Sequence, residues 1–187
     1  MDDDESGLIS YVELADMVRN ELLLGAAELR PHFPVDNGKL WFRGDEPEKF
    51  DASDLTLQRA VRIGLHTDVH AIFGRRDTMG SMIRVTNPPR IDQVFVAALN
   101  MHAPLPHAQH LESKTGFLLR AAYEGTYLTA LWRKSRVLYL TLVGGGSFGN
   151  RPEMIADAIA KAHAHWTGHP ASQYLERVIL AIYPQGD

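Results

Sequence analysis

A run of glycines between an apolar strand and an amphipathic helix is the feature of this sequence best suited to chemistry. The segment VLYLTLV (residues 137–143) is followed by GGGSFGN and then by RPEMIADAIAKAHA (residues 151–164). In a strand–loop–helix unit of this kind, backbone N–H groups at the helix N-terminus and the helix dipole both favour a bound anion. The pattern predicts a phosphate-binding loop made of Gly144, Gly145, Gly146, Ser147, Phe148, Gly149 and Asn150.

Two common glycine motifs do not fit this loop. Its glycines satisfy G-x-G-x-x-G. In dinucleotide-binding folds, however, this fingerprint lies in the first strand–helix–strand unit and several strands follow it, whereas here only one predicted strand follows. The spacing also suits a P-loop, but Asn150 and Arg151 stand where that motif has Lys and Ser or Thr. Asn150 is instead expected to cap the helix, with Glu153 completing a capping box. A glycine turn without a ligand stays open as an alternative, although ordering three consecutive glycines costs entropy.

Two carboxylates are candidates for acid–base chemistry, Asp68 and Asp77. Asp68 interrupts an otherwise apolar strand, where an aspartate is unfavourable unless it has a function or marks a break in the strand. A carboxylate there could orient a water molecule or act as a general base. Asp77 lies in a polar loop nine residues further on, where a solvated side chain is the simpler interpretation.

The nine histidines do not form a recognisable metal motif. There is no HExxH sequence, and His163 and His165 point in different directions on their predicted helix. The absence of cysteine excludes disulfides, thiol catalysis and cysteine-ligated zinc. We therefore expect neither a metal nor a cofactor, and we retain His66 and His102 as polar contacts near a ligand cleft.

The composition suits one ordinary globular domain. The chain has 187 residues, of which 45% are hydrophobic and 22% charged, enough for a single sizeable core. A net charge of −4 without a block of Lys or Arg argues against a nucleic-acid partner. No apolar run reaches the roughly 18–20 residues that cross a membrane. The acidic start MDDDESG is unlike a secretory signal, so we expect a cytoplasmic protein or a translocated effector.

The predicted elements alternate between strand and helix. Apolar positions at helical spacing are clearest over residues 115–132, and residues 136–143 are apolar on both faces, which is typical of a central parallel strand. This alternation predicts an α/β fold with helices on both faces of a sheet. We expect one domain over residues 1–187, with residues 1–10 frayed and residues 11–60 as an N-terminal extension. The remaining elements are helices over 11–29 and 151–166 and strands over 61–73, 92–99 and 177–183.

Residues 91–183 resemble a macrodomain, the ADP-ribose-binding α/β fold. The resemblance rests on VFVAALN (residues 94–100), LLRAAYEGTYLTAL (118–131), VLYLTLVGGGSFG (137–149), PEMIADAIAKA (152–162) and RVILAIY (177–183). It implies a three-layer mixed sheet with helices on both faces. The chain departs from the family where MHAPLP (101–106) replaces the usual first glycine-rich loop, and residues 1–90 match it poorly. The segments GLHTDV and GGGSFGN are similar to those of bacterial effector-type enzymes that remove ADP-ribose from arginine.

This resemblance implies an ADP-ribosyl hydrolase acting on modified protein. The glycine loop (residues 144–150) would wrap the diphosphate, Phe148 would cover the distal ribose, and Asn100 would lie at the carboxyl edge of the sheet. Asp68 would be the principal carboxylate and Asp77 a second one. Phe148 as a core anchor and Asn100 as a turn residue stay open as alternatives. So do two other functions, a binding module for ADP-ribose that cleaves nothing and an interaction domain without a ligand.

Overall fold

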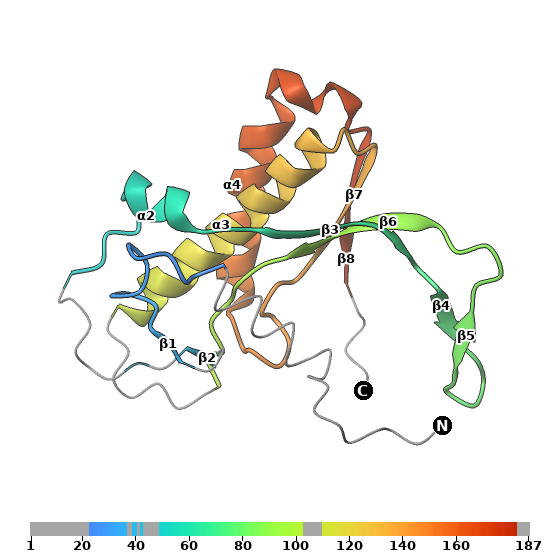
Figure 1. Cartoon of the computed structure of the whole chain (residues 1–187), viewed down its shortest axis with the longest axis horizontal. Helices are drawn as coiled ribbons and strands as arrows, with labels where there is room; N and C mark the ends of the chain where they lie inside the picture. Colours follow the sequence, from blue (N-terminus) through green and yellow to red (C-terminus); the bar gives the residue numbers. More distant parts are fainter. Residues whose placement is uncertain (1–22, 37–38, 41, 43–48, 103–109, 183–187) are drawn as a thin grey trace.

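The described residues adopt a mixed α/β fold in which three α-helices accompany several small sheets (Figure 1). The computed structural model describes residues 23–36, 39–40, 42, 49–102 and 110–182. Within these ranges, no helix is both long and apolar enough to cross a membrane. The site of interest depends on two parts of this fold, a parallel strand–helix–strand unit near the C-terminus and a long antiparallel ribbon before it.

The parallel unit consists of β7 (Val137–Thr141), α4 (Pro152–Thr167) and β8 (Arg177–Ala181). β7 and β8 pair in parallel, with Tyr139 opposite Ile179, which confirms the predicted β-α-β arrangement. A short 3-10 helix, η2 (Pro170–Tyr174), follows α4 and leads into β8. Because β7 and β8 are parallel, the glycine loop leaves the carboxyl end of β7 and enters α4, where open α/β sheets bind ligands.

Helix α3 (Leu111–Trp132) forms the centre of the molecule. Its C-terminal half packs on α4 and on one face of β7, because its apolar residues recur at helical spacing and the β7 residues alternate. The members of this buried cluster are Leu119, Tyr123, Tyr127, Ala130, Leu138, Leu140, Ile155, Ala158 and Ala162. The observed bounds of α3 include the predicted helix over residues 115–132.

A second buried cluster covers the N-terminal half of α3. It joins Phe117 and Leu118 to residues before β3, among them Phe33, Phe42 and Phe50, and the rings of Phe33 and Phe117 stack with centroids 5.8 Å apart. This region contains β1 (Val35–Asp36), β2 (Lys39–Leu40) and α2 (Leu55–Ala60). The helix predicted over residues 11–29 lies mainly outside the described residues, and its described end, residues 23–29, forms turns instead.

The antiparallel ribbon is made of β3 (Gly64–His70), β4 (Phe73–Arg76), β5 (Met82–Arg84) and β6 (Arg90–Phe95). β3 pairs with β6 and β4 with β5, so the ribbon folds back on itself like one long hairpin. The pairing of β3 with β6 shifts register between His66 and Val69. Asp68, at this bulge, has a positive φ of 57°, a conformation that aspartate tolerates better than most residues.

The described strands do not assemble into the single three-layer sheet that the sequence led us to expect. They form four two-stranded sheets. β7, predicted to be a central strand buried on both faces, pairs within the described part of the chain with β8 alone. Its Tyr139 side chain is 66% exposed, because both neighbouring helices pack on the opposite face. What the structure supports is therefore the broader class, a mixed α/β fold with small sheets.

Candidate functional site

The glycine loop is tied to the strand segment that ends at Asn100. The Asn150 amide, only 3% exposed, donates to the Leu99 carbonyl oxygen at 2.7 Å. The Met101 N–H donates to the Phe148 carbonyl oxygen at 2.6 Å. Asn150 thus faces inward, so the prediction that it caps α4 is wrong. The N-cap position belongs to Arg151, without a capping side chain, and Pro152 opens the helix, where its missing N–H costs nothing.

Two of the loop glycines hold conformations that other residues adopt only with strain. Gly144 has φ of 73° and Gly149 has φ of 64°. A Cβ on Gly144 would lie 2.8 Å from the Asn150 side chain, and one on Gly149 would lie 2.4 Å from the His102 ring. A Cβ on Gly146, in contrast, would meet no atom within 4 Å. Gly144 and Gly149 are thus needed for the fold of the loop, whereas Gly146 leaves open space beside the backbone.

Within the described part of the chain, two backbone N–H groups of the loop are left without an acceptor. The N–H groups of Gly145, Gly149 and Asn150 bond within the loop or to its start. Those of Gly146 and Ser147 have no acceptor among the described residues. Both residues line a hollow of about 230 Å³, together with Val96, Ala98, Val143, Gly144 and Phe148. Unused N–H groups beside a helix N-terminus suit an anionic ligand.

The Tyr123 hydroxyl stabilises the end of β7, from which the loop departs. It donates to the Thr141 carbonyl oxygen at 2.8 Å and accepts from the Val143 N–H at 3.0 Å. Burial raises the pKa of Tyr123, and the Val143 hydrogen bond opposes this only in part. The phenol therefore stays protonated at neutral pH and serves as donor and acceptor at once.

A larger groove runs along β7 and ends at Val143, the residue before the loop. Its volume is about 800 Å³, its walls are β6 and β7, and its floor is the α3 face that carries Tyr123, Thr126 and Ala130. Val96 and Val143 line both this groove and the hollow at the loop, so the two spaces are adjacent. The volume lies within the range typical of small-molecule sites.

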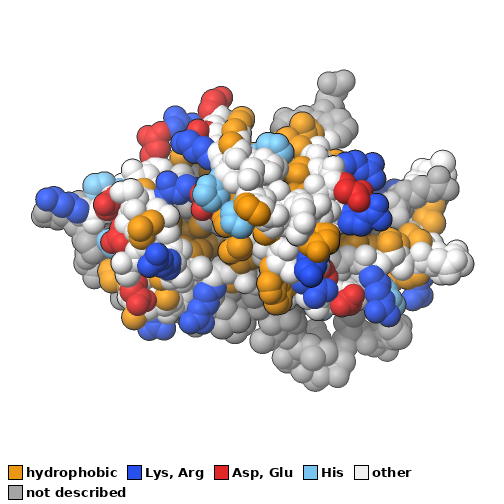
Figure 2. All heavy atoms as spheres, turned by 90° about the horizontal axis from the view of Figure 1, so that it is seen from above, with side chains coloured by type: hydrophobic (Ala, Val, Ile, Leu, Met, Phe, Trp, Pro, Cys, Tyr) orange, Lys and Arg blue, Asp and Glu red, His pale blue; other side chains and the backbone are white. Residues whose placement is uncertain are grey.

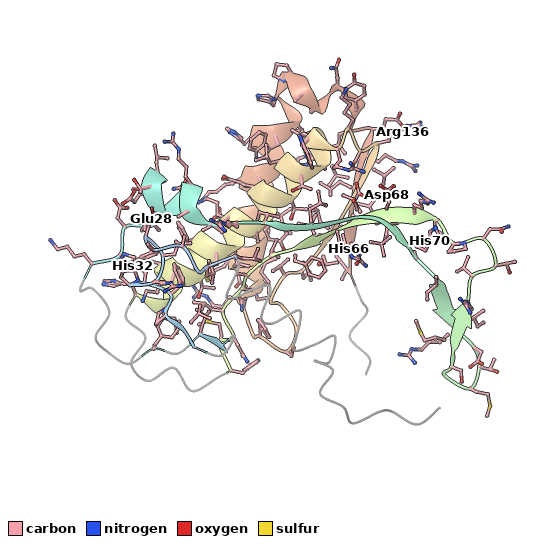
Figure 3. The ribbon with its side chains drawn as sticks, viewed as in Figure 1. Glu28, His32, His66, Asp68, His70 and Arg136 are labelled. Atoms are coloured by element: carbon pink, nitrogen blue, oxygen red, sulfur yellow. The ribbon has the colours of Figure 1, made fainter. Side chains whose placement is uncertain are left out.

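Asp68 lies at the far end of the groove, near the start of β7 and the end of α3 (Figure 3). Its N–H donates to the Asp92 carboxylate at 2.9 Å, and Arg133 donates to the same carboxylate at 2.8 Å. The Asp68 carboxylate is 3.6 Å from the Arg133 guanidinium, and its side chain is 61% exposed. The hydrogen bond from Arg133 lowers the pKa of Asp92, with a smaller contribution from the Asp68 N–H. Asp92 therefore stays ionised and braces the bulge that carries Asp68.

Of the remaining residues predicted to bind a ligand, Asn100 and Phe148 lie at the loop and His66 does not. Asn100 is next to the loop, and its side-chain oxygen accepts from the His102 N–H at 3.1 Å, as a turn residue would. Phe148 lines the hollow at the loop. His66 is exposed on β3 and lines neither the groove nor the hollow.

Asp77 is not brought to the loop. Its carboxylate accepts from the Met79 and Ser81 N–H groups and forms the turn between β4 and β5. Within the described ranges, no three His, Asp or Glu side chains are grouped so that they could hold a metal ion.

Three residues at this site were not identified from the sequence, namely Asp92, Tyr123 and Arg133. Asp92 and Arg133 are 41 positions apart, and their pairing depends on the end of α3 reaching β6. Only Tyr123 could have been noticed from the local sequence, as an aromatic residue in the apolar stripe of a helix.

Comparisons with known proteins do not place the chain in a family: no family model matches it, and neither a curated protein nor a solved structure is significantly similar to it.

Proposed function

We propose that this protein binds ADP-ribose through the glycine loop and removes it from modified protein. The observation that carries the proposal is the pair of unused N–H groups on Gly146 and Ser147, two residues that line a hollow adjacent to a long groove. A diphosphate placed there would accept these hydrogen bonds and lie near the N-terminus of α4. The resemblance of residues 91–183 to a macrodomain supports ADP-ribose over other diphosphates.

The groove accounts for the rest of the ligand. With the diphosphate at the loop, one end of the molecule would extend between β6 and β7 over Thr126 and Ala130. The groove volume of about 800 Å³ suits a nucleotide-sized ligand. Phe148 lines the loop end and would contact the adenosine ribose there, whereas the distal ribose, which carries the arginine, would lie toward Asp68.

In the hydrolytic step, a water oxygen would bond to the anomeric carbon of the ribose as the carbon–nitrogen bond breaks. The electron pair of that bond would pass to the guanidine nitrogen, which takes up a proton. Asp68 is the carboxylate in the groove best placed to orient the water or accept its proton. Asp92 and Arg133 would keep Asp68 at the bulge without touching the ligand.

A binding module without hydrolysis is the second candidate. It is supported by the exposure of Asp68 and by its separation from the loop along the length of β7. In that function the loop would hold the diphosphate in the same way, and no residue would activate water.

Two measurements test these proposals. Calorimetric titration with ADP-ribose, NAD and AMP should show the tightest binding for ADP-ribose, and the absence of heat at millimolar ligand would exclude both candidates. Wild type should then release ADP-ribose from arginine-modified protein, whereas Asp68→Asn should bind equally well and lose about 100-fold or more in rate. Equal rates in the two proteins would remove Asp68 from the mechanism. Binding without release by wild type would leave the binding module.

A further inference from the structure

Residues 70–90 form a projecting two-stranded arm, which we call the arginine arm. It contains β4 and β5, and two backbone hydrogen bonds within it, from Ala71 to Pro89 and from Val85 to Ile72, link its two sides between the β3–β6 pair and the β4–β5 pair. Asp77 closes its tip through three hydrogen bonds with the backbone of Met79 and Ser81. In Figure 1 the arm extends away from both large helices and past the β7–β8 pair. It is therefore an ordered extension of the ribbon that carries Asp68.

The charge of the arm is opposite to that of the rest of the chain. It contains Arg75, Arg76, Arg84 and Arg90 against the one acidic residue Asp77, which is a net charge of +3. Since the whole chain carries −4, the remaining residues carry −7. The arm is at the right of Figure 1, and at the same end of the molecule in Figure 2 basic and hydrophobic side chains are both visible.

The exposed side chains of the arm are suited to a protein partner. Met79 at the tip is 87% exposed, and Met82 is exposed on β5. Arg84 makes no hydrogen bond or ion pair with any described residue, and it lines a hollow of about 380 Å³ with His70, Ile72 and Pro88. Methionine and arginine are enriched in protein–protein interfaces. A duplex nucleic acid would also meet the acidic remainder of the chain, which would oppose its binding.

We propose that the arginine arm docks an acidic surface of the protein whose ADP-ribose group enters the groove. This inference rests on the proposed function for the identity of the partner. The arm begins two residues after Asp68, so a polypeptide that leaves the Asp68 end of the groove meets the arm first. Its arginines would then select acidic sequence around the modified residue, and the methionines would contact apolar side chains of that surface.

The test uses two labelled peptides of about 20 residues, which reach about 65 Å when extended. Both carry ADP-ribose on a central arginine, which is flanked by Asp and Glu in one peptide and by Ser and Gln in the other. Fluorescence anisotropy gives Kd for the full-length wild type, for Arg84→Glu and for the control Arg177→Glu, which makes the same charge change at an exposed position of β8. We expect wild type and the control to bind the acidic peptide about tenfold more tightly, and Arg84→Glu to lose this preference. Added salt should reduce the preference because exposed charges are screened.

Each alternative outcome has a distinct meaning. Equal Kd values for the two peptides in wild type, or an unchanged preference in Arg84→Glu, would overturn the docking proposal. So would a duplex DNA that binds wild type at the same salt, displaces the acidic peptide and loses affinity in Arg84→Glu. The same peptides without ADP-ribose separate the two proposals. If they bind as tightly as the modified ones, the glycine-loop function fails, whereas the effect of Arg84→Glu on the acidic preference still decides the role of the arm.

Discussion

The two ends of the groove are built by different interactions. At the loop end, a buried amide, Asn150, bonds to the Leu99 carbonyl, and Gly144 and Gly149 have positive φ values that the turn requires. At the Asp68 end, partly or largely exposed charges from β3, from β6 and from the end of α3 meet through Asp92 and Arg133. The first end therefore depends on desolvated hydrogen bonds and backbone conformation, and the second on pairs that water and salt can screen.

This difference indicates how the two ends would contribute to function. A loop held by buried bonds keeps its N–H groups in place before a ligand arrives, which lowers the cost of binding. Exposed ion pairs contribute little to stability, but they can orient a carboxylate that must reach solvent and substrate. We therefore expect substitutions at the loop end to affect folding strongly and those at the Asp68 end to affect it weakly.

Asn150→Asp should have the largest effect on stability. The new carboxylate would face the Leu99 carbonyl in a site that is 3% exposed, so unfolding at pH 7.5 should become easier by about 3 kcal/mol. Burial would raise the pKa of this carboxyl above its unfolded value, and its protonated form could donate to Leu99. The deficit should therefore be greatest at neutral pH and shrink as pH falls toward about 4. Urea denaturation of both proteins from pH 7.5 to pH 4.5 measures this, and a deficit independent of pH would contradict the assignment.

Gly144→Ala should have an intermediate effect. The substitution combines a positive φ with a Cβ placed 2.8 Å from the Asn150 side chain, for a cost of about 1–2 kcal/mol. Gly146→Ala is the matched control, since its Cβ meets no atom and its stability should stay within about 0.5 kcal/mol of wild type. The control should nevertheless weaken ADP-ribose binding in calorimetry if the ligand approaches that backbone. Equal unfolding midpoints for both variants would argue against the described loop conformation.

Arg133→Gln should have the smallest effect. Arg133 holds the pKa of Asp92 below its ordinary value of 3.8, so its stabilising contribution is present above that pH and is lost as pH falls through the lowered pKa. Thermal unfolding should show a small difference from wild type at pH 7, which disappears below about pH 3 and decreases with added salt. A difference as large as that of Asn150→Asp would show that the two ends are equally buried, contrary to the comparison.

Local periodicity was informative for the C-terminal half and much less so elsewhere. The stripe along α3 and the apolar run of β7 predicted their elements closely, because each pattern is contained within a single helix or strand. The prediction for residues 61–73 identified extended chain, but not that this segment forms one side of a long ribbon with a bulge at Asp68. The described strands do not form the single sheet expected from strand alternation, since strand pairing depends on partners far along the chain.

By itself, the sequence determined the strand–glycine–helix order around residues 144–150 and the amphipathic helices beside it, because these follow from neighbouring residues. Only the tertiary structure decided that Asn150 turns inward to Leu99, 51 positions away, and that Asp68 lies at the opposite end of the groove from the loop. The physical reason is that both depend on how separate elements pack. Side-chain burial and hydrogen-bond partners are set by contacts across the fold, which no local pattern of residue types specifies.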